Sequence, residues 1–378
     1  MEYHVLFTIF LENPRQLLSG SRPVVKEIDR LEQFVSSEVI DSVAEYAQSF
    51  QNGQPFRHVV IDQFLAPEFC ARICEEFPAF ESRHAVDENK KVGGKATREK
   101  VRLLGPAFEQ ADDLVQSVEF LKLVEQLTGI QQVHYDPFYF GGGTHENRAG
   151  QDLDPHVDFN YHPVSNQHRR LNLIIYLNDE WDDAWGGSLQ LHRDPYLEPD
   201  EDEIVTVTPL MNRCVIFETT EHSWHGFERI KLPEDKQHLS RKSFAVYFYT
   251  DVRPSAETGV EHSTIYVERH LPARFKTGTA LMEEDVGEIK RLLARRDQHL
   301  KRLYQNIKDL NEALAETRYS GSGNSSVALD LDEVPEDLRS AVRMIQDLRR
   351  KVHDFETSTS WRLTAPVRAV KRLLTGKS

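Results

Sequence analysis

Short apolar runs separated by polar clusters dominate the middle of the chain. The runs are rich in Val, Ile, Tyr and Phe, and clusters of Gly, Pro, Asn and Asp separate them; they span residues 133–140, 169–178, 188–194, 203–209, 213–219 and 241–250. Such runs predict β-strands. Many short strands without sustained helical periodicity between them are typical of a sandwich or a jelly-roll barrel. We therefore expect a mainly β domain with supporting helices.

The helices are predicted ahead of these strands. Residues 58–65 fit a short strand, and residues 66–77 carry a proline at a helix start followed by apolar residues at helical spacing. Residues 117–129 form a second helical pattern that Gly129 closes. We place a β domain at residues 55–270 and a helical extension at residues 1–54, whose role the pattern does not indicate.

The apolar spacing changes again after residue 283. Apolar residues alternate at intervals of three and four through residues 284–318, which predicts a coiled-coil helix. Residues 319–334 are typical of a linker, and residues 335–378 predict an amphipathic helix followed by a basic tail. The two helices could pack on each other or on a second copy of the chain, so a homo-oligomer is one expectation.

Charge and composition limit the partners. The chain has 378 residues, a net charge of −15 and three cysteines, which argues against nucleic-acid binding and against a disulfide framework. Without an apolar run of 18 residues or a secretory leader, we expect a cytoplasmic protein. The last 22 residues carry five Lys or Arg and no acid. We expect the tail either to contact the inner face of the cytoplasmic membrane, or to pack on the acidic body or stay disordered.

The stretch "DPHVDF" at residues 154–159 introduces candidate chemistry. His156 and Asp158 are two apart, so at the end of a strand both side chains point to one side and can converge on one ion. A non-haem iron site of the oxygenase kind needs two imidazoles and a carboxylate on one face of the metal. The His-x-Asp pair alone is weak evidence for a metal site, because polar residues at the end of a strand give the same pattern.

Later strands offer the missing groups. The stretch "CVIFETTEHSWHGF" contains His222 and His225; we favour His225 because it enters an apolar segment, whereas His222 lies in a polar turn. Arg241 and Ser243 begin the run "RKSFAVYFYT" and share one strand face. A guanidinium with a neighbouring hydroxyl can neutralise a buried carboxylate.

These motifs in this order resemble the prolyl 4-hydroxylase-like family of Fe(II)- and 2-oxoglutarate-dependent dioxygenases, over roughly residues 55–252. The resemblance implies a double-stranded β-helix, also called a jelly roll. It further implies that His156, Asp158 and His225 bind Fe(II), that Arg241 and Tyr176 hold the far carboxylate of 2-oxoglutarate, and that ascorbate serves as a reductant. Ser243 is expected to add a hydrogen bond to that carboxylate.

Neighbouring segments carry weaker predictions. Residues 138–152 contain three consecutive glycines and no strand pattern, which suits a flexible loop over the site. Tyr139, His145 and Asn160 are candidate substrate contacts. Gly186 and Gly187 predict a turn with positive φ, and the acidic residues 197–203 predict a solvated loop.

The favoured function is an active hydroxylase that couples conversion of 2-oxoglutarate and O₂ to succinate and CO₂ with hydroxylation of a C–H bond. A protein prolyl residue is one candidate substrate. A surface-glycan component is another, because the C-terminal segment resembles tails of bacterial surface-polysaccharide enzymes. The alternative is a catalytically silent scaffold protein peripheral to the membrane, in which the β domain binds a ligand and the C-terminal helices act.

Overall fold

The computed structural model describes residues 30–85, 95–272 and 274–320. The predictions for residues 1–29, for the linker beyond residue 320 and for the amphipathic helix and basic tail at 335–378 therefore lie outside the described residues. The chain divides into two compact units, Met1–Leu300 and Lys301–Ser378. The following description concerns the first unit unless helix α8 is named.

Antiparallel strands form two sheets in the described part of the chain. The larger sheet has the order β1-β9-β6-β11-β4-β2, with β3 also pairing with β11, and the smaller has the order β12-β5-β10-β7-β8. The strands are β1 (His58–Ile61), β2 (Ala96–Arg98), β3 (His134–Tyr135), β4 (Gly143–Asn147), β5 (Leu153–Val157), β6 (His168–Tyr176), β7 (Leu189–His192), β8 (Ile204–Val207), β9 (Arg213–Glu218), β10 (Trp224–Phe227), β11 (Arg241–Thr250) and β12 (Ile265–Tyr266). This mainly antiparallel arrangement with few helices matches the predicted jelly roll.

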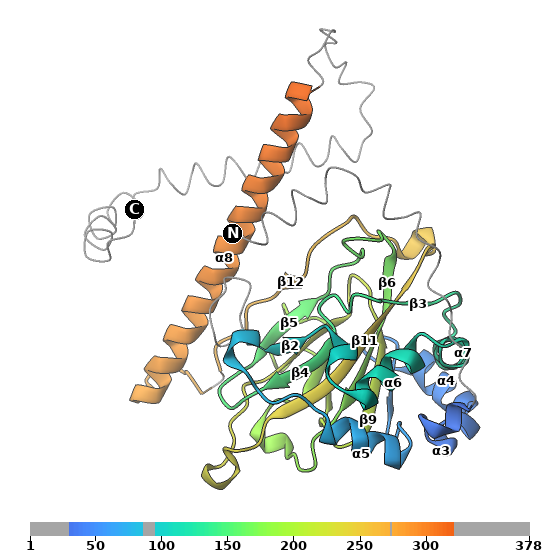
Figure 1. The fold of residues 1–378 in the computed structure, drawn as a ribbon. Helices are drawn as coiled ribbons and strands as arrows, with labels where there is room; N and C mark the ends of the chain where they lie inside the picture. Colours follow the sequence, from blue (N-terminus) through green and yellow to red (C-terminus); the bar gives the residue numbers. More distant parts are fainter. Residues whose placement is uncertain (1–29, 86–94, 273, 321–378) are drawn as a thin grey trace. The chain divides into compact units, whose positions relative to one another are not determined.

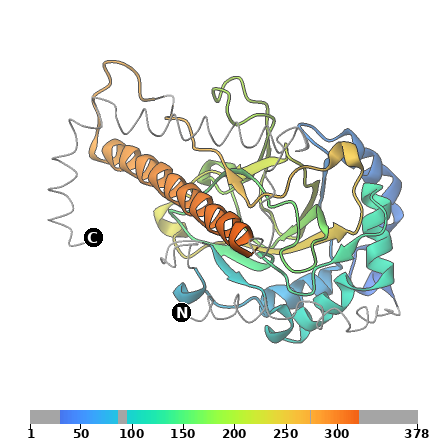
Figure 2. The ribbon, with the colours of Figure 1, turned by 90° about the horizontal axis from the view of Figure 1, so that it is seen from above.

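Helices support the larger sheet on one side (Figure 1, and from above in Figure 2). The α-helices are α3 (Ser37–Asp41), α4 (Val43–Asn52), α5 (Pro67–Glu75), α6 (Pro106–Val115), α7 (Val118–Thr128) and α8 (Glu283–Ser320). Short 3-10 turns are η1 (Leu31–Gln33), η2 (Ser82–His84), η3 (Val101–Leu103), η4 (Asp183–Trp185), η5 (Glu234–Lys236) and η6 (Ser255–Glu257). Val39 of α3 and Phe50 of α4 belong to the same apolar core as Phe69 of α5 and Leu123 of α7.

Strand β6 shows how the alternation of side chains builds the layers. Leu171, Leu173 and Ile175 face the helices and join the large core between helices and sheet. Ile174 and Tyr176 point the other way and pack in a smaller core between the two sheets. Because side chains of a strand alternate between its faces, one apolar strand serves both cores.

The segment 138–152 differs from its prediction as a flexible loop. It contains β4, whose five residues are all buried and which pairs with β11 on one side and β2 on the other. The sequence Gly-Thr-His-Glu-Asn lacks the apolar alternation of a strand, because one of its faces lines the polar space between the sheets. Strand β2 likewise lies inside the basic segment 90–102, for which no strand was predicted.

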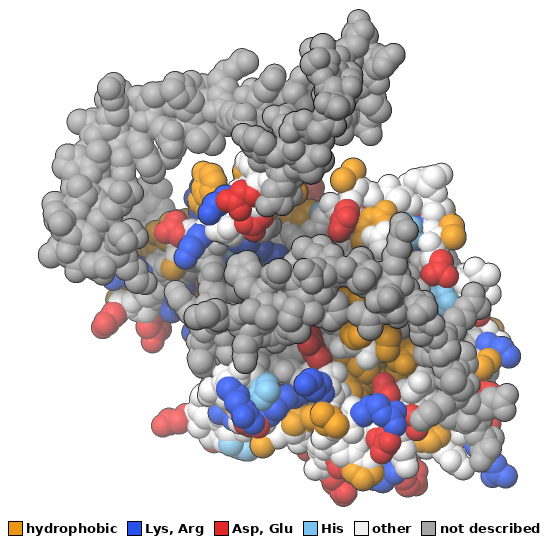
Figure 3. Space-filling model, turned by 45° about the horizontal axis from the view of Figure 1, so that its top comes forward, with side chains coloured by type: hydrophobic (Ala, Val, Ile, Leu, Met, Phe, Trp, Pro, Cys, Tyr) orange, Lys and Arg blue, Asp and Glu red, His pale blue; other side chains and the backbone are white. Residues whose placement is uncertain are grey.

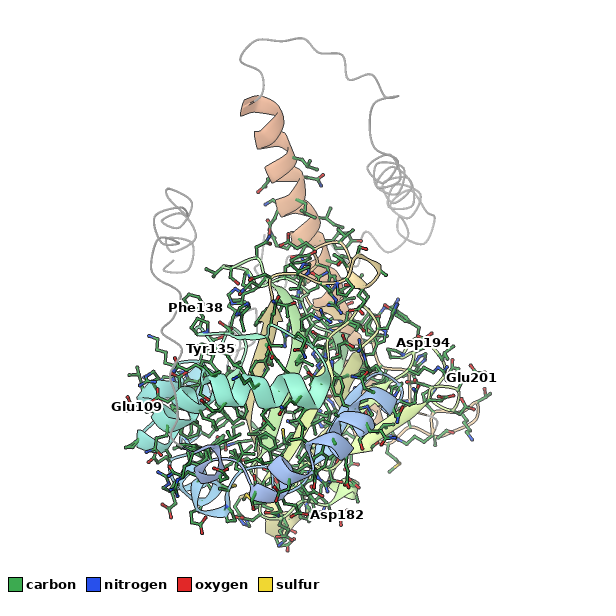
Figure 4. The ribbon with its side chains drawn as sticks, turned by 90° about the vertical axis from the view of Figure 1, so that its right-hand side faces the viewer. Glu109, Tyr135, Phe138, Asp182, Asp194 and Glu201 are labelled. Carbon is green, nitrogen blue, oxygen red and sulfur yellow. The ribbon has the colours of Figure 1, made fainter. Side chains whose placement is uncertain are left out.

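Two predicted turns are present. Gly186 and Gly187 have φ of 69° and 75°, the left-handed region predicted for them. A Cβ on Gly187 would lie 2.9 Å from Trp181 and 3.0 Å from Ile230, so this position also requires the absence of a side chain. The acidic segment after β7 projects as a loop, and Figure 4 shows its residues Asp194 and Glu201 on the side away from Tyr135 and Phe138.

Helix α8 runs over Glu283–Ser320 and carries the predicted heptad residues. Its apolar side chains Leu293, Leu303, Ile307 and Leu310 are between 41% and 66% exposed. None of the described helices is both long enough and apolar enough to cross a membrane.

Candidate metal centre

Two histidines and an aspartate converge in the space between the sheets. His156 lies in β5, Asp158 follows one residue after its end, and His225 lies opposite His156 on the neighbouring strand β10. One ligand atom from each residue lies within 4.8 Å of the other two. The distances from Asp158 are 3.8 Å between Oδ1 and Nε2 of His156 and 3.6 Å between Oδ2 and Nε2 of His225.

Backbone carbonyls fix the orientation of both imidazoles. Nδ1 of His156 lies 2.9 Å from the carbonyl oxygen of Asp154, and Nδ1 of His225 lies 2.9 Å from that of Ser223. A carbonyl only accepts, so in both rings the proton sits on Nδ1 and the lone pair is on Nε2. Both Nε2 atoms therefore face the Asp158 carboxylate with a free lone pair, which is the arrangement that metal-binding histidines adopt.

Asp158 is held by two partners from β6. Nη2 of Arg169 lies 3.1 Å from its Oδ2, and the Asn172 amide donates to the same oxygen at 2.8 Å. Arg169 is 1% exposed and also donates to the Asn172 side-chain oxygen. The guanidinium lies over the ring of Tyr247 at 3.7 Å from its centroid. These contacts leave the carboxylate charged and give it one orientation.

A bulge in β6 places Arg169 in the site. The pairing of β11 with β6 shifts so that Phe248 lies opposite Leu171 and Tyr249 opposite Arg169, which leaves Arg170 unpaired. With regular alternation, Arg170 and not Arg169 would share the face of Asn172. The extra residue reverses this order, a known use of bulges beside active sites.

Burial and charge set the protonation of the three groups. Burial, with the imidazole of His225 beside it, lowers the pKa of His156 to about 3. Burial also lowers the pKa of His225. Burial would raise the pKa of Asp158, but the Arg169 guanidinium and the two imidazoles outweigh it and hold this pKa well below its usual value. At neutral pH the site thus offers two neutral imidazoles and a carboxylate, which are the ligand forms that a divalent metal binds.

Arg241 is buried between the sheets without an acidic partner. Its Nε donates to the carbonyl of Gly187 at 2.5 Å, and its Nη2 donates to the Tyr176 hydroxyl at 3.1 Å. Its guanidinium lies over the rings of Phe227 and Tyr176 at 4.4 and 4.9 Å from their centroids. No carboxylate among the described residues pairs with it. A buried guanidinium with one unused edge is suited to an anionic ligand.

Neighbouring strands add further groups to this face. Ser243, at 1% exposure, lies opposite both Tyr176 and His145 in the strand register. Nε2 of His145 lies 3.0 Å from the carbonyl of Gly141 and 3.3 Å from Nζ of Lys95. Burial lowers the pKa of Lys95 to about 8, while the charge of Asp158 acts to raise it. The space near Asp158 and Arg241 thus also contains an ammonium group.

Three predicted or considered residues lie elsewhere. Tyr139 is buried in the core against the helices, and its hydroxyl donates to Asp112 of α6 at 2.9 Å. The Asn160 amide bonds the Val260 carbonyl and the His262 N–H, so it joins two loops. His222 is exposed in the turn before β10. The structure therefore does not bring Tyr139 to the triad, and it uses the Asn160 amide for loop contacts.

Sequence reasoning missed Arg169, Asn172 and Lys95. Asn172 was detectable, because it is a polar residue at an inward position of the otherwise apolar run 171–177. Arg169 was not, since the bulge reverses the alternation. Lys95 belongs to the basic segment 90–102, in which the sequence indicated no chemistry.

Basic and hydrophobic side chains lie together on the face of the molecule drawn in Figure 3, although the chain is acidic as a whole.

Comparisons with known proteins agree with this geometry. Residues 142–249, which include all three triad residues and Arg241, match the model of the 2OG-Fe(II) oxygenase superfamily. This segment of the β domain is thus similar to 2OG-Fe(II) oxygenases.

Prolyl hydroxylases are among the proteins to which the chain is similar. Over 255 residues the chain is 24% identical to the mouse prolyl 3-hydroxylase OGFOD1, a match that spans 61% of this chain and 44% of that relative. A prolyl 4-hydroxylase from Phytophthora capsici is 17% identical with a TM-score of 0.40, covering 72% of this chain and 78% of the other. A Trichoplax adhaerens prolyl hydroxylase, solved with a peptide of hypoxia inducible factor, is 14% identical with a TM-score of 0.41, covering 58% and 95%.

Proposed function

We propose that the protein is an Fe(II)- and 2-oxoglutarate-dependent hydroxylase. The observation that carries this proposal is the convergence of two Nε2 lone pairs and one carboxylate at His156, Asp158 and His225. Two neutral nitrogens and one oxygen on one side of a site suit a non-haem Fe(II) ion, with open positions left for co-substrate and oxygen.

Arg241 supports 2-oxoglutarate as the co-substrate. This molecule keeps a second carboxylate away from the metal, and that charge needs a buried partner. The guanidinium of Arg241, without an acid of its own among the described residues, is suited to it, with the hydroxyls of Tyr176 and Ser243 in neighbouring register positions.

Bound iron would supply oxygen activation, with the net reaction of 2-oxoglutarate, O₂ and a C–H substrate giving succinate, CO₂ and the hydroxylated product. The protein's own residues keep His156 and His225 neutral, hold Asp158 charged through Arg169 and Asn172, and exclude water by burial. These tasks are orientation and electrostatics, which are what a protein contributes to cofactor chemistry.

For the substrate we propose a prolyl residue of a protein, because the curated relative is a prolyl 3-hydroxylase. A surface-glycan component is the other candidate; it depends on the C-terminal tail, which lies outside the described residues. Ascorbate is proposed as a reductant on the basis of the family resemblance alone. Product identity is testable by mass spectrometry of extracts with and without the protein, as a gain of one oxygen.

The test of the activity is succinate formation from 2-oxoglutarate with Fe(II) and O₂. We expect wild-type protein to form succinate and His156→Ala to lose this activity, whereas His222→Ala, a histidine exposed in the nearby turn, keeps it. If the wild type forms no succinate and binds no divalent metal, the scaffold alternative replaces the hydroxylase.

A co-substrate variant adds a sharper readout. Arg241→Met should raise the KM for 2-oxoglutarate about tenfold to hundredfold, as expected for loss of a charge-assisted hydrogen bond. The preference for 2-oxoglutarate over 2-oxobutyrate, which lacks the far carboxylate, should shrink by the same factor. An unchanged preference would remove Arg241 from this role.

We also propose a peripheral contact of the basic tail with the inner face of the cytoplasmic membrane and a homo-oligomer through the α8 region. The exposed apolar residues of α8 support the second. Deleting residues 357–378 should release the protein from anionic vesicles, and unchanged binding would exclude the tail as an anchor.

A further inference from the structure

The segment that follows the last long strand returns to the metal centre. Strand β12 is only two residues long, yet its Tyr266 lies opposite His156 in the register with β5, and the Val267 N–H donates to the Pro155 carbonyl at 2.8 Å. In Figure 1 β12 lies beside β5 at the edge of the smaller sheet. Tyr266 therefore shares the face of the candidate ligand.

Aromatic rings connect helix α8 to that ligand. The ring of Tyr266 stacks on His156, with centroids 5.2 Å apart and planes at 28°. The ring of His299 from α8 also stacks on Tyr266, at 5.2 Å and with planes at 23°. The ring of His156 is thus confined between His225, at 4.2 Å, and Tyr266. This confinement restricts the rotation that would move Nε2 away from Asp158.

Asp154 makes a second connection between the same elements. Its carbonyl accepts the Nδ1 proton of His156, while its carboxylate, 3% exposed, receives Arg295 of α8 at 3.1 Å and Arg269 at 3.3 Å. Nε2 of His299 lies 3.6 Å from the same carboxylate. Asp154, which orients the imidazole of His156, is therefore itself held by α8 and by the segment that follows β12.

Arg269 and Arg295 bind further groups at the ends of β5 and β10. Arg269 donates to the carbonyls of Leu153 and Phe227 at 2.8 and 2.7 Å, so it joins the two strands at the ends where these residues lie opposite each other. Arg295 also donates to Asp152 at 2.5 Å. Every residue of this network lies within the compact unit Met1–Leu300.

We infer that Tyr266, His299 and the Asp154–Arg269–Arg295 cluster are positioning residues of the metal centre. The first half of α8, which the sequence pattern assigns to a coiled coil separate from the β domain, is on this inference a working part of the site. The inference rests on the proposed function, since it concerns the same metal. Groups that orient a ligand histidine commonly change metal affinity tenfold to a hundredfold when removed.

The test is Co(II) binding by the full-length protein, followed by the d–d absorption spectrum of the bound ion. Tyr266→Leu should weaken Co(II) binding about tenfold and change the spectrum, whereas Tyr266→Phe, which keeps the ring, should restore both. Tyr304→Leu serves as the matched control, because it removes a 56% exposed tyrosine from α8, the helix that carries His299.

A double-mutant cycle separates the route through Tyr266 from a merely structural effect. His299→Ala should weaken Co(II) binding on its own, and its effect should be smaller in the Tyr266→Leu background, because part of that effect passes through the Tyr266 ring. If Tyr266→Leu does not fold, comparing His299→Ala with Tyr304→Leu decides. Wild-type affinity and spectrum in both His299→Ala and Asp154→Asn would overturn the inference.

The inference and the proposed function fail differently. If wild-type protein binds no Co(II), or binds it unchanged in His156→Ala, the metal centre itself is wrong. If the wild type binds at His156 but all positioning variants bind equally well, only the inference is wrong.

Discussion

Charged side chains at this site lower the stability of the folded chain but are available to bind a ligand. A buried cation costs free energy unless a partner neutralises it, and both Arg241 and Lys95 face the polar space between the sheets. Arg169 has Asp158, whereas the hydrogen-bond partners of Arg241 are neutral. Such groups are expected where a ligand completes the charge balance.

Lys95 gives the first prediction at this scale. Burial lowers its pKa from 10.5 to about 8, with Asp158 and Glu99 acting against this and Arg169 and Arg241 acting with it. The charged form is therefore less favourable in the folded than in the unfolded chain. Lys95→Met should raise the free energy of unfolding at pH 7 by about 1 to 3 kcal/mol, because it removes an ammonium group that is more costly to keep charged in the folded chain.

The pH dependence of this gain has a defined sign. Below pH 8 both states carry the proton and the cost is complete. Between pH 8 and 10.5 the folded state loses the proton first, so the cost declines as pH rises. This gain in the free energy of unfolding is measured by denaturant unfolding across pH 7 to 10.5. Lys95→Met is compared with Lys100→Met, a control at an exposed site. A constant difference over this range would contradict the lowered pKa.

Among the secondary-structure elements, strands β4 and β6 depend on pairing with other strands, whereas helix α7 depends on its local sequence. The bulge in β6 aims Arg169 at Asp158, and the pairing of β4 between β11 and β2 brings a polar segment into the sheet. Helix α7 instead follows local rules: Ser117 caps its start by accepting the Phe120 N–H at 3.2 Å, and Gly129 closes it with φ of 75°.

The cap gives the second prediction. Ser117 is fully buried and its hydroxyl also donates to the Leu114 carbonyl at 2.7 Å. Ser117→Ala should lower the free energy of unfolding by about 1 to 2 kcal/mol, since both bonds are lost at a buried helix start. The matched control is Ser36→Ala, because Ser36 begins α3 without a side-chain capping bond. Equal losses in the two variants would contradict the capping role; Co(II) affinity should not change in either.

At the scale of the whole molecule, the metal centre joins distant parts of the chain. His156 and His225 come from strands about 70 residues apart, and Asp154 links them to α8. A metal bound at the triad should therefore stabilise the folded unit, by about 2.7 kcal/mol at a free concentration 100 times its Kd.

Thermal unfolding with and without Co(II) measures this stabilisation. We expect EDTA to reverse it and His225→Ala to abolish it, whereas His222→Ala, in the exposed turn before β10, should behave as the wild type. A Co(II)-dependent shift in Tm that persists in His225→Ala would place the metal elsewhere.

Local sequence patterns were enough to predict the class of fold and the candidate ligands. Short runs rich in Val, Ile, Tyr and Phe predicted β6, β9 and β11, and the order of His156, Asp158, His225 and Arg241 indicated the oxygenase, because these properties depend on local composition or on short motifs. The same reasoning selected His225 over His222, and the structure brings His225 into the triad and leaves His222 exposed.

Only the tertiary structure decided the groups that surround those ligands. Arg169 faces Asp158 because of a register shift between two strands, β4 is a strand because its neighbours pair with it, and Tyr266 and His299 reach His156 because α8 returns to the edge of the smaller sheet. Each of these contacts joins segments far apart in the chain. Their formation depends on pairing and packing in three dimensions, which local hydrophobic patterns do not encode.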